Sequence, residues 1–353
     1  MTPKEAARRR DFTINSLFLD LETGEIMDPF GGLADLEAGI LRATDPDTFV
    51  EDDLRPWRAM QLLARKAKTV APETLELIRS HDWDFDDLPP ERKKEELDKL
   101  LLKSEKPSIG LEYLRESGLI DQPDFKELES MIDCPQNPEW HPEGDVWIHN
   151  CFVVDAAARV RHMIPEEWRL AFMYGALLHD VGKPSTTVLP ICTAHGHDAK
   201  GVPIALEFMG RLTNEKQLTD RVAALVLNHL RPYQLTGKAK PSAWKRLHRK
   251  VERLDVLGWL SRADWAGRGN RDPLTPSENG VTVEHPPSAA CFEFFAELGN
   301  EPIKPVILGR HLIAEGHKPG RAFAPALAAA FEAQLDNPEW GQAELLRVAV
   351  AAI

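Results

Sequence analysis

The chain of 353 residues has 43 Lys and Arg against 56 Asp and Glu, and this formal net charge of −13 argues against a protein that coats nucleic acid non-specifically. It has no apolar run of about 18 residues, and no apolar stretch follows its N-terminal arginines, so we expect neither a membrane span nor a secretory signal. Its four scattered cysteines fit neither a zinc pattern nor a disulfide framework. We therefore expect a cytoplasmic protein of two or three globular domains.

The first elements of the chain are expected to be short. Regularly spaced apolar residues from Phe12 to Asp20, followed by turn residues at 21–25, predict a strand or short helix and then a hairpin-like connection. Residues 44–47, Thr-Asp-Pro-Asp, are typical of a helix start, and we expect the acidic residues 51–53 in the first turn of the helix that follows. That helix is expected to carry three arginines and to pack its apolar side inward, namely Arg55, Arg58 and Arg65 with Leu54, Trp57, Leu62 and Leu63.

Most of the remaining chain is predicted to be helical. Apolar residues recur with the helical period between Pro90 and Ile120, and a proline-rich break from Pro135 to Pro142 marks a domain boundary. Helical patterns continue to about Leu260, and an alanine-rich helix ends near Leu335. Three segments are predicted to be irregular, residues 184–196, 231–241 and 267–288.

Basic residues form local clusters on this acidic chain. The clusters are Arg8 to Arg10, the run Arg55, Arg58, Arg65, Lys66 and Lys68, and the stretch Lys245, Arg246, His248, Arg249 and Lys250. Each can make a positive surface that attracts an anion. The last cluster can equally be a solvated helix face.

Residues 9–15, Arg-Arg-Asp-Phe-Thr-Ile-Asn, resemble the ribose-contacting motif of the class II CCA-adding enzymes and bacterial poly(A) polymerases. Residues 51–55, Glu-Asp-Asp-Leu-Arg, resemble the base-reading EDxxR motif of the same family, and Asp-Pro-Phe-Gly-Gly at 28–32 lies between the two, as in that family. The resemblance extends from Arg8 to about Asp336.

The resemblance implies roles for six residues. Arg9 or Arg10 would meet the sugar or triphosphate of CTP or ATP, and Asp11 the ribose hydroxyl. Asp52 and Arg55, which we expect on one face of a helix, would offer an acceptor and a forked donor to the edge of a base. Arg58 is expected in the same nucleotide site. The alternative, that the acidic residues only complement a helix N-terminus, is compatible with this role.

A second resemblance lies in the helical part. His149, the pair His179-Asp180 and Asp264 have the order and spacing of the HD phosphohydrolase superfamily, with extra histidines at His197 and His229 where its two-metal members have them. Imidazole and carboxylate ligands suit divalent ions such as Mg, Mn, Ni or Co. We expect all six residues to be metal ligands, with His179 and Asp180 also catalytic.

In the resembling family, two metal-binding carboxylates and a Gly-rich phosphate loop precede the Arg-Arg-Asp motif. Seven residues precede Arg8 here and hold no such carboxylate pair. We therefore expect the sequence to begin inside the catalytic head. We also expect a polypeptide of residues 1–353 alone not to incorporate CTP or ATP into tRNA.

The resemblance implies a mainly α chain of four parts. These are a remnant of an α+β nucleotidyltransferase head at 1–45, a helical neck that binds RNA at 46–135, an all-α HD domain at 136–275, and a small helical C-terminal module at 276–353. We interpret the chain as a tRNA nucleotidyltransferase of 3′-end processing that takes CTP or ATP and an RNA 3′ end. Two alternatives remain open: a stand-alone HD phosphohydrolase acting on phosphomonoesters or 2′,3′-cyclic phosphates, and a non-catalytic tRNA-binding module that works with a separately encoded catalytic head.

Overall fold

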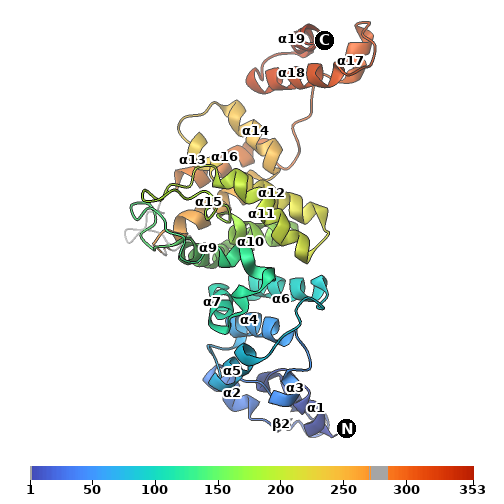
Figure 1. Ribbon diagram of the computed structural model, residues 1–353. Coiled ribbons are helices and arrows are strands. Elements are labelled where there is room, and N and C mark those ends of the chain that lie inside the picture. The colour runs from blue at the N-terminus through green and yellow to red at the C-terminus, as the bar shows by residue number, and fades with distance from the viewer. Residues whose placement is uncertain (1, 270, 272–284) are drawn as a thin grey trace, which may run out of the picture. The chain divides into compact units, whose positions relative to one another are not determined.

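The computed structural model describes residues 2–269, 271 and 285–353 (Figure 1). The chain divides into two compact units, residues 1–229 with 259–283 and residues 230–258 with 284–353. The connection that we expect at 267–288 lies largely outside the described residues. No helix in the described part of the chain is both long and apolar enough to cross a membrane.

The first unit begins with short elements and continues with longer helices. Its elements before the proline-rich break are α1 Pro3–Arg8, η1 Thr13–Asn15, β1 Phe18–Leu19, β2 Ile26–Met27, α2 Gly32–Ala38, β3 Ile40–Leu41, α3 Pro46–Phe49, α4 Arg55–Lys66, β4 Thr69–Val70, α5 Pro72–Ser80, α6 Pro90–Lys103, α7 Ser108–Ser117, η2 Leu119–Asp121, η3 Pro123–Phe125 and α8 Lys126–Glu129. β1 pairs antiparallel with β2, and β3 pairs parallel with β4. The hairpin expected after Phe12 is thereby confirmed.

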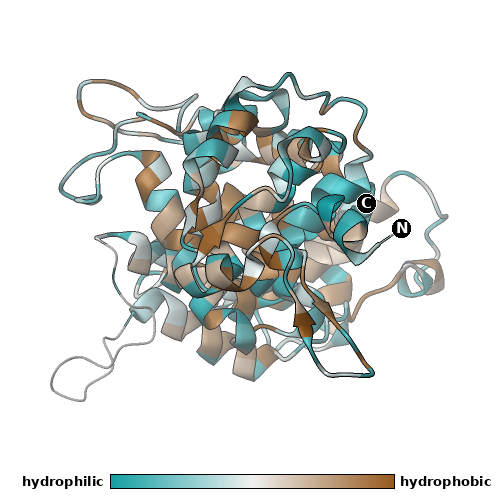
Figure 2. Ribbon diagram, turned by 90° about the horizontal axis from the view of Figure 1, so that it is seen from below, coloured by the Kyte–Doolittle hydropathy of each residue, from teal (hydrophilic) through white to brown (hydrophobic). Residues whose placement is uncertain are grey.

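The helical bundle of the first unit follows the proline-rich break. It contains α9 Val146–Val160, η4 Arg161–Met163, α10 Glu166–Leu178, α11 His197–Leu212 and α12 Lys216–Asn228, together with the second half of α15 Leu254–Gly267. Figure 1 shows α9 to α12 side by side, and α10 packs against both α9 and α12. In Figure 2 hydrophobic and hydrophilic residues are interspersed along the helices, and hydrophobic residues also occur in some loops.

The second unit is also helical. It contains α13 Arg231–Leu235, α14 Pro241–Val251, the first part of α15, α16 Pro286–Leu298, α17 Gly309–Ala314, α18 Phe323–Asp336 and α19 Gln342–Ala351. Helix α18 confirms the alanine-rich helix expected to end near Leu335. Helix α13 shows that the segment 231–241 is not entirely irregular. The mainly helical fold class is confirmed.

A helix does start at residues 44–47, as predicted, but it is shorter than expected. Asp45 caps α3, because its carboxylate accepts a hydrogen bond from the Thr48 amide at 3.1 Å. Helix α3 ends at Phe49, and α4 begins only at Arg55. The acidic residues 51–53 therefore lie in the turn between two helices, and the expectation that they form the first turn of the long helix is wrong.

Gly182, in the turn after α10, allows that turn to approach α11 closely. A Cβ atom at Gly182 would lie 2.1 Å from the carbonyl oxygen of His197 and 2.7 Å from the amide nitrogen of Gly201. Any larger side chain must push these backbones apart. Glycine at this position thus brings His179 and Asp180 close to the start of α11.

Candidate nucleotide cleft and metal centre

A cleft of about 550 Å³ lies in the first unit, among the elements between Arg9 and Lys99. Its lining residues are Arg9, Arg10, Asp11, Asn15, Asp52, Arg55, Arg58, Gln61, Leu62, Arg65 and Lys99. All six residues that the sequence analysis assigns to nucleotide binding are among them. The volume lies within the range of about 300–1,000 Å³ that small-molecule sites occupy.

The carboxylate of Asp11 is held in place from three directions. It accepts hydrogen bonds from the amide of Phe12 at 2.7 Å, from Nδ2 of Asn15 at 3.0 Å and from Nη1 of Arg58 at 3.1 Å. Arg58 also lies 3.6 Å from the buried carboxylate of Glu96. Burial alone lowers the pKa of Arg58, but the carboxylates of Asp11, Glu96 and Asp52 together raise that pKa above its usual value. Arg58 therefore stays charged and joins the Arg-Arg-Asp motif to α4.

The structure places Asp52 and Arg55 differently from our expectation. Asp52 precedes α4, so the two residues do not share a helix face, and this part of the prediction is wrong. Asp52 pairs with Nη2 of Arg92 at 3.1 Å, while the guanidinium of Arg55 donates to the carbonyl oxygens of Thr48 and of Arg9, the latter at 2.8 Å. Two of the five N–H donors of Arg55 are thus used, and the side chain is pre-oriented at the cleft.

The charge of the cleft favours an anionic ligand. Six cationic side chains line it against two carboxylates, although the whole chain is strongly acidic. Four polar residues here were missed by the sequence analysis as site residues, Asn15, Gln61, Arg65 and Lys99. Lys99 comes from α6, and no local pattern near it signals the contact. Such a concentration of guanidinium groups is suited to a triphosphate.

The six residues expected as metal ligands come together in the helical bundle. Their ligand atoms form two groups, His149 with His179 and Asp264, and Asp180 with His197 and His229, and within each group the atoms lie within 4.8 Å of one another. Asp180 joins the groups, because Oδ2 lies 3.2 Å from Nε2 of His179 and Oδ1 lies 3.2 Å from Nε2 of His197. All six side chains are buried.

The four histidines share one arrangement that suits metal ligation. The Nδ1 atom of each faces an acceptor, at 2.7 Å from Glu143 for His149, 2.9 Å from the Ala176 carbonyl for His179, 2.6 Å from the Ala194 carbonyl for His197 and 2.7 Å from the Val226 carbonyl for His229. A neutral histidine that donates from Nδ1 carries a lone pair on Nε2. In that neutral form, each of the four histidines offers Nε2 as a ligand atom.

The centre of this cluster is suited to a bound cation. Nε2 of His149 and Nε2 of His179 are buried without a hydrogen-bond partner, although carboxylate oxygens lie 3.2 Å from each. Two facing acceptors repel unless a proton or cation lies between them, and an unsatisfied buried polar atom costs about 1–3 kcal/mol. The residues present thus fit the divalent metal that an HD domain implies.

The electrostatics of the cluster keep the carboxylates ionised. Burial alone raises the pKa of Asp180, but His179 and Lys183 reverse this and hold it well below the usual value. Asp264 behaves in the same way, with Arg268 and His149 overcoming its burial. Burial and the neighbouring His179 lower the pKa of His229 to about 4, so His229 is neutral at physiological pH.

Glu143 is a functional candidate that the sequence analysis missed. Its buried carboxylate accepts hydrogen bonds from Nδ1 of His149 at 2.7 Å, from Nδ1 of His141 at 2.8 Å and from the amide of Gly269 at 3.0 Å. Burial opposes its ionisation, but the two histidines lower the pKa of Glu143 far below its usual value. A carboxylate behind a ligating histidine fixes the ring and increases its basicity. Its position beside His141, two residues away in the chain, is the only sequence signal for it.

We expect the Glu143→Gln variant to bind divalent metal about 10–100-fold more weakly than the wild type. The amide keeps the volume of the side chain but removes the charge that orients His149. Metal affinity measured by competition with a chromophoric chelator provides the test. Glu139→Gln, an exposed carboxylate four residues away, is the matched control and should leave the affinity unchanged. Equal affinities in the two variants would contradict the role of Glu143.

Three families match successive parts of the chain. Residues 1–42 match the Poly A polymerase head domain, residues 69–129 the probable RNA and SrmB-binding site of polymerase A, and residues 146–266 the HD domain. A multifunctional CCA protein of Stenotrophomonas maltophilia is 34% identical over 323 residues, which cover 88% of this chain and 77% of that protein.

Two solved structures share the fold. The CCA-adding enzyme of Bacillus stearothermophilus in complex with CTP superposes with a TM-score of 0.64 at 20% identity, over 99% of this chain and 74% of the other. The Thermotoga maritima CCA-adding enzyme complexed with tRNA gives a TM-score of 0.54 at 17% identity, again over 99% of this chain and 74% of the other. At these identities the likeness concerns the fold alone.

Proposed function

Because this chain belongs to the family of the multifunctional CCA proteins, we propose that it is a tRNA nucleotidyltransferase chain of 3′-end processing with a metal-dependent HD phosphohydrolase site. Its ligands are CTP or ATP and the 3′ end of a tRNA. The fold shared with CCA-adding enzymes solved with CTP and with tRNA supports this proposal.

One observation carries the proposal for the transferase part. Arg9, Arg10 and Asp11 meet Arg55 and Arg58 in a single cationic cleft, although more than forty residues of sequence separate the two sets. The Asp11–Arg58 pair then lies where a ribose hydroxyl could be bound, and the guanidinium groups around it would hold the triphosphate. Asp52 and Arg55, at the same cleft, are positioned to contact the base.

We expect the wild-type chain to bind CTP and ATP, and the Arg58→Gln variant to bind both at least about tenfold more weakly, since a charged hydrogen bond contributes about 1.5–3 kcal/mol. Equilibrium binding of a fluorescent nucleotide measures the effect. Lys66→Gln is the matched control, because Lys66 is an exposed cation on the same helix and does not line the cleft.

Arg58→Gln also leaves Asp11 and Glu96 with fewer partners, so its thermal melting must be compared with that of the wild type. Arg65→Gln provides a second variant that removes a cation from the wall of the cleft at a half-buried position. Nucleotide binding that is unchanged in both folded variants would refute the assignment of this cleft.

The HD cluster supports a second activity in the same chain, hydrolysis of phosphoesters. Divalent ions held by the two ligand groups would supply an activated water and a clamp for phosphate oxygens. Lys183, whose Nζ lies 2.7 Å from Oδ2 of Asp180, adds a cation at the edge of the site. We propose Mg, Mn, Ni or Co as the metal, because imidazole and carboxylate ligands suit these ions and no cysteine belongs to either ligand group.

The comparisons do not favour the two alternatives drawn from the sequence, the stand-alone phosphohydrolase and the non-catalytic module. For the domains we retain the proposed boundaries, with a head part at 1–45, a neck at 46–135, an HD domain at 136–275 and a C-terminal module at 276–353. The family matches fall within the first three of these parts. We propose the cytoplasm as the location of the protein.

A further inference from the structure

Helix α14 of the second unit has a buried apolar side and an exposed basic side. Trp244 and Leu247 are buried, and the Trp244 ring stacks on Phe294 of α16 with the ring centroids 5.0 Å apart. His248, which the sequence analysis groups with the surface cations, is only 1% exposed, and burial lowers its pKa. The exposed charge of this helix therefore lies on Arg249 and Lys250.

Side chains of α18 contact two of the arginines on the basic side of α14. Nε of Arg246 lies 2.6 Å from Oε2 of Glu332, and Nη2 of Arg246 lies 2.7 Å from Oδ2 of Asp336. Arg249 lies over the ring of Phe331, 5.0 Å from its centroid, and 3.8 Å from the same Glu332. Arg246 and Arg249 are thus held by the acidic and aromatic side chains of α18.

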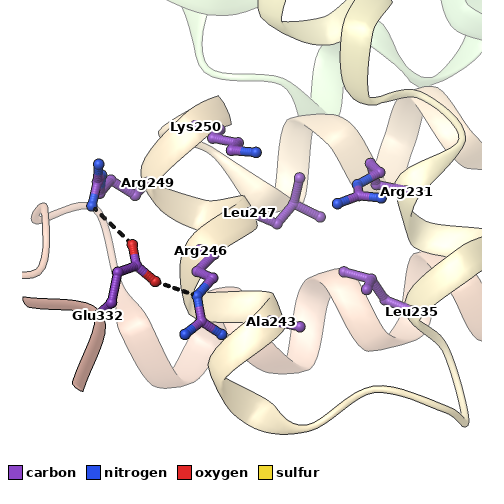
Figure 3. Close-up of a pocket in the computed structure, with 8 residues that line it drawn as sticks. All are labelled: Arg231, Leu235, Ala243, Arg246, Leu247, Arg249, Lys250 and Glu332. Atoms are coloured by element: carbon purple, nitrogen blue, oxygen red, sulfur yellow. Dashed lines mark hydrogen bonds and ion pairs between the residues drawn. The ribbon is translucent and has the colours of Figure 1, made fainter. Parts of the chain in front are cut away.

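Among the described residues, Arg231 and Lys250 are two cations of the second unit for which no carboxylate partner is found. Arg231 donates to the neutral Oε1 of Gln234 at 2.9 Å, and within the described part of the chain no carboxylate pairs with Arg231 or Lys250. Figure 3 shows the two side chains projecting toward each other from α13 and α14, with Leu247 between them. Both residues are exposed, so an anion can reach them from solvent.

These side chains surround a small pocket. It has a volume of about 230 Å³ and is lined by four cations and one carboxylate, with an apolar floor, namely Arg231, Arg246, Arg249, Lys250 and Glu332 over Leu235, Ala243 and Leu247. This volume lies below the range of about 300–1,000 Å³ for sites that enclose a small molecule. The pocket therefore suits a single phosphate group better than a whole nucleotide.

We propose that this pocket binds a backbone phosphate of the RNA on which the protein acts, with Arg231 and Lys250 as its principal contacts. The inference rests on the proposed function for the identity of the RNA. A chain of net charge −13 repels a polyanion at long range, so it needs local cationic sites to hold one. A guanidinium fork and an ammonium group facing each other can share the oxygens of one phosphodiester.

The test is the salt dependence of RNA binding by the full chain. Binding of a labelled tRNA that lacks its 3′-terminal nucleotides is followed by fluorescence anisotropy over a series of KCl concentrations. Wild type, Arg231→Gln, Lys250→Gln and the double variant are compared. We expect each single variant to bind about 3–10-fold more weakly at low salt, with the slope of log K against log [KCl] smaller by about 0.7–1.

Lys245→Gln is the matched control, because it removes one cation from the same helix outside the pocket. We expect its slope to equal that of the wild type. A merely structural effect of the two test substitutions would change thermal melting and leave the slope unchanged. Variants that bind tRNA with the wild-type slope would overturn the inference while leaving the proposed function standing.

A titration with inorganic phosphate distinguishes the two sources of the ligand. If phosphate shifts the guanidinium NMR signal of Arg231 while the variants bind tRNA normally, the pocket is a site for free anions and the RNA assignment is wrong. If the wild-type chain binds no tRNA at all, the proposed function fails together with this assignment. A variant that loses both tRNA affinity and the phosphate-induced shift would confirm that the pocket binds a backbone phosphate of the RNA.

Discussion

Asp180→Asn is expected to abolish both stoichiometric metal binding and hydrolysis of phosphoesters. The two oxygens of Asp180 face different histidines, His179 and His197, so this carboxylate belongs to both ligand groups. Asparagine has the same shape but lacks the negative charge that a divalent ion requires. Loss of a residue that orients a metal ligand typically lowers metal affinity by about 10–100-fold. We expect loss of this shared ligand to lower it by more than about 100-fold.

The measurement combines metal content with turnover. Purified wild type and variant are analysed by mass spectrometry for bound metal, and hydrolysis of a 2′,3′-cyclic nucleotide and of a simple phosphomonoester is followed with added Mg, Mn, Ni or Co. His195→Ala is the matched control, because His195 is exposed, lies two residues before His197 and belongs to neither ligand group. Stoichiometric metal in the Asp180→Asn protein would show that the ligand set is wrong.

Asp52→Ala is expected to relax the choice between bases more than it weakens tRNA binding. Asp52 borders the cleft beside the pre-oriented guanidinium of Arg55, and together they offer an acceptor and donors to a base edge. Loss of one hydrogen-bonding partner should reduce discrimination of CTP and ATP against UTP by about 10–100-fold, which corresponds to about 1.4–2.8 kcal/mol. Arg55→Lys, which keeps the charge but loses the fork, should have the same effect.

This effect is measured as the relative affinities of the chain for the three nucleotides, with tRNA binding followed in parallel. Asp53→Ala is the control, because Asp53 accepts a hydrogen bond from the Asp84 amide at 3.1 Å and does not line the cleft. Full discrimination in Asp52→Ala and Arg55→Lys, with loss of tRNA binding, would indicate that this surface contacts RNA and does not read the base.

The sequence prediction misplaced two residues, Asp52 and His248. Asp52 was expected on the helix that carries Arg55, because a capping signal and an acidic run are usually parts of one helix. The cap instead belongs to α3, whose end at Phe49 leaves a turn, and in that turn Asp52 pairs with Arg92, forty residues away. His248 lies in a basic stretch, but the helical period directs it inward beside Phe295 of α16.

The amino-acid sequence by itself determined the family, the helical fold class and the identity of six candidate metal ligands, because helix caps, apolar periodicity and short motifs are encoded within a few neighbouring residues. Only the tertiary structure decided how these ligands divide into two groups around Asp180, and that Glu143 orients His149. It also decided that Arg231 and Lys250 line one pocket, with Leu247 between them. Such pairings depend on how separate helices pack, and no local pattern specifies the partner of a buried charge.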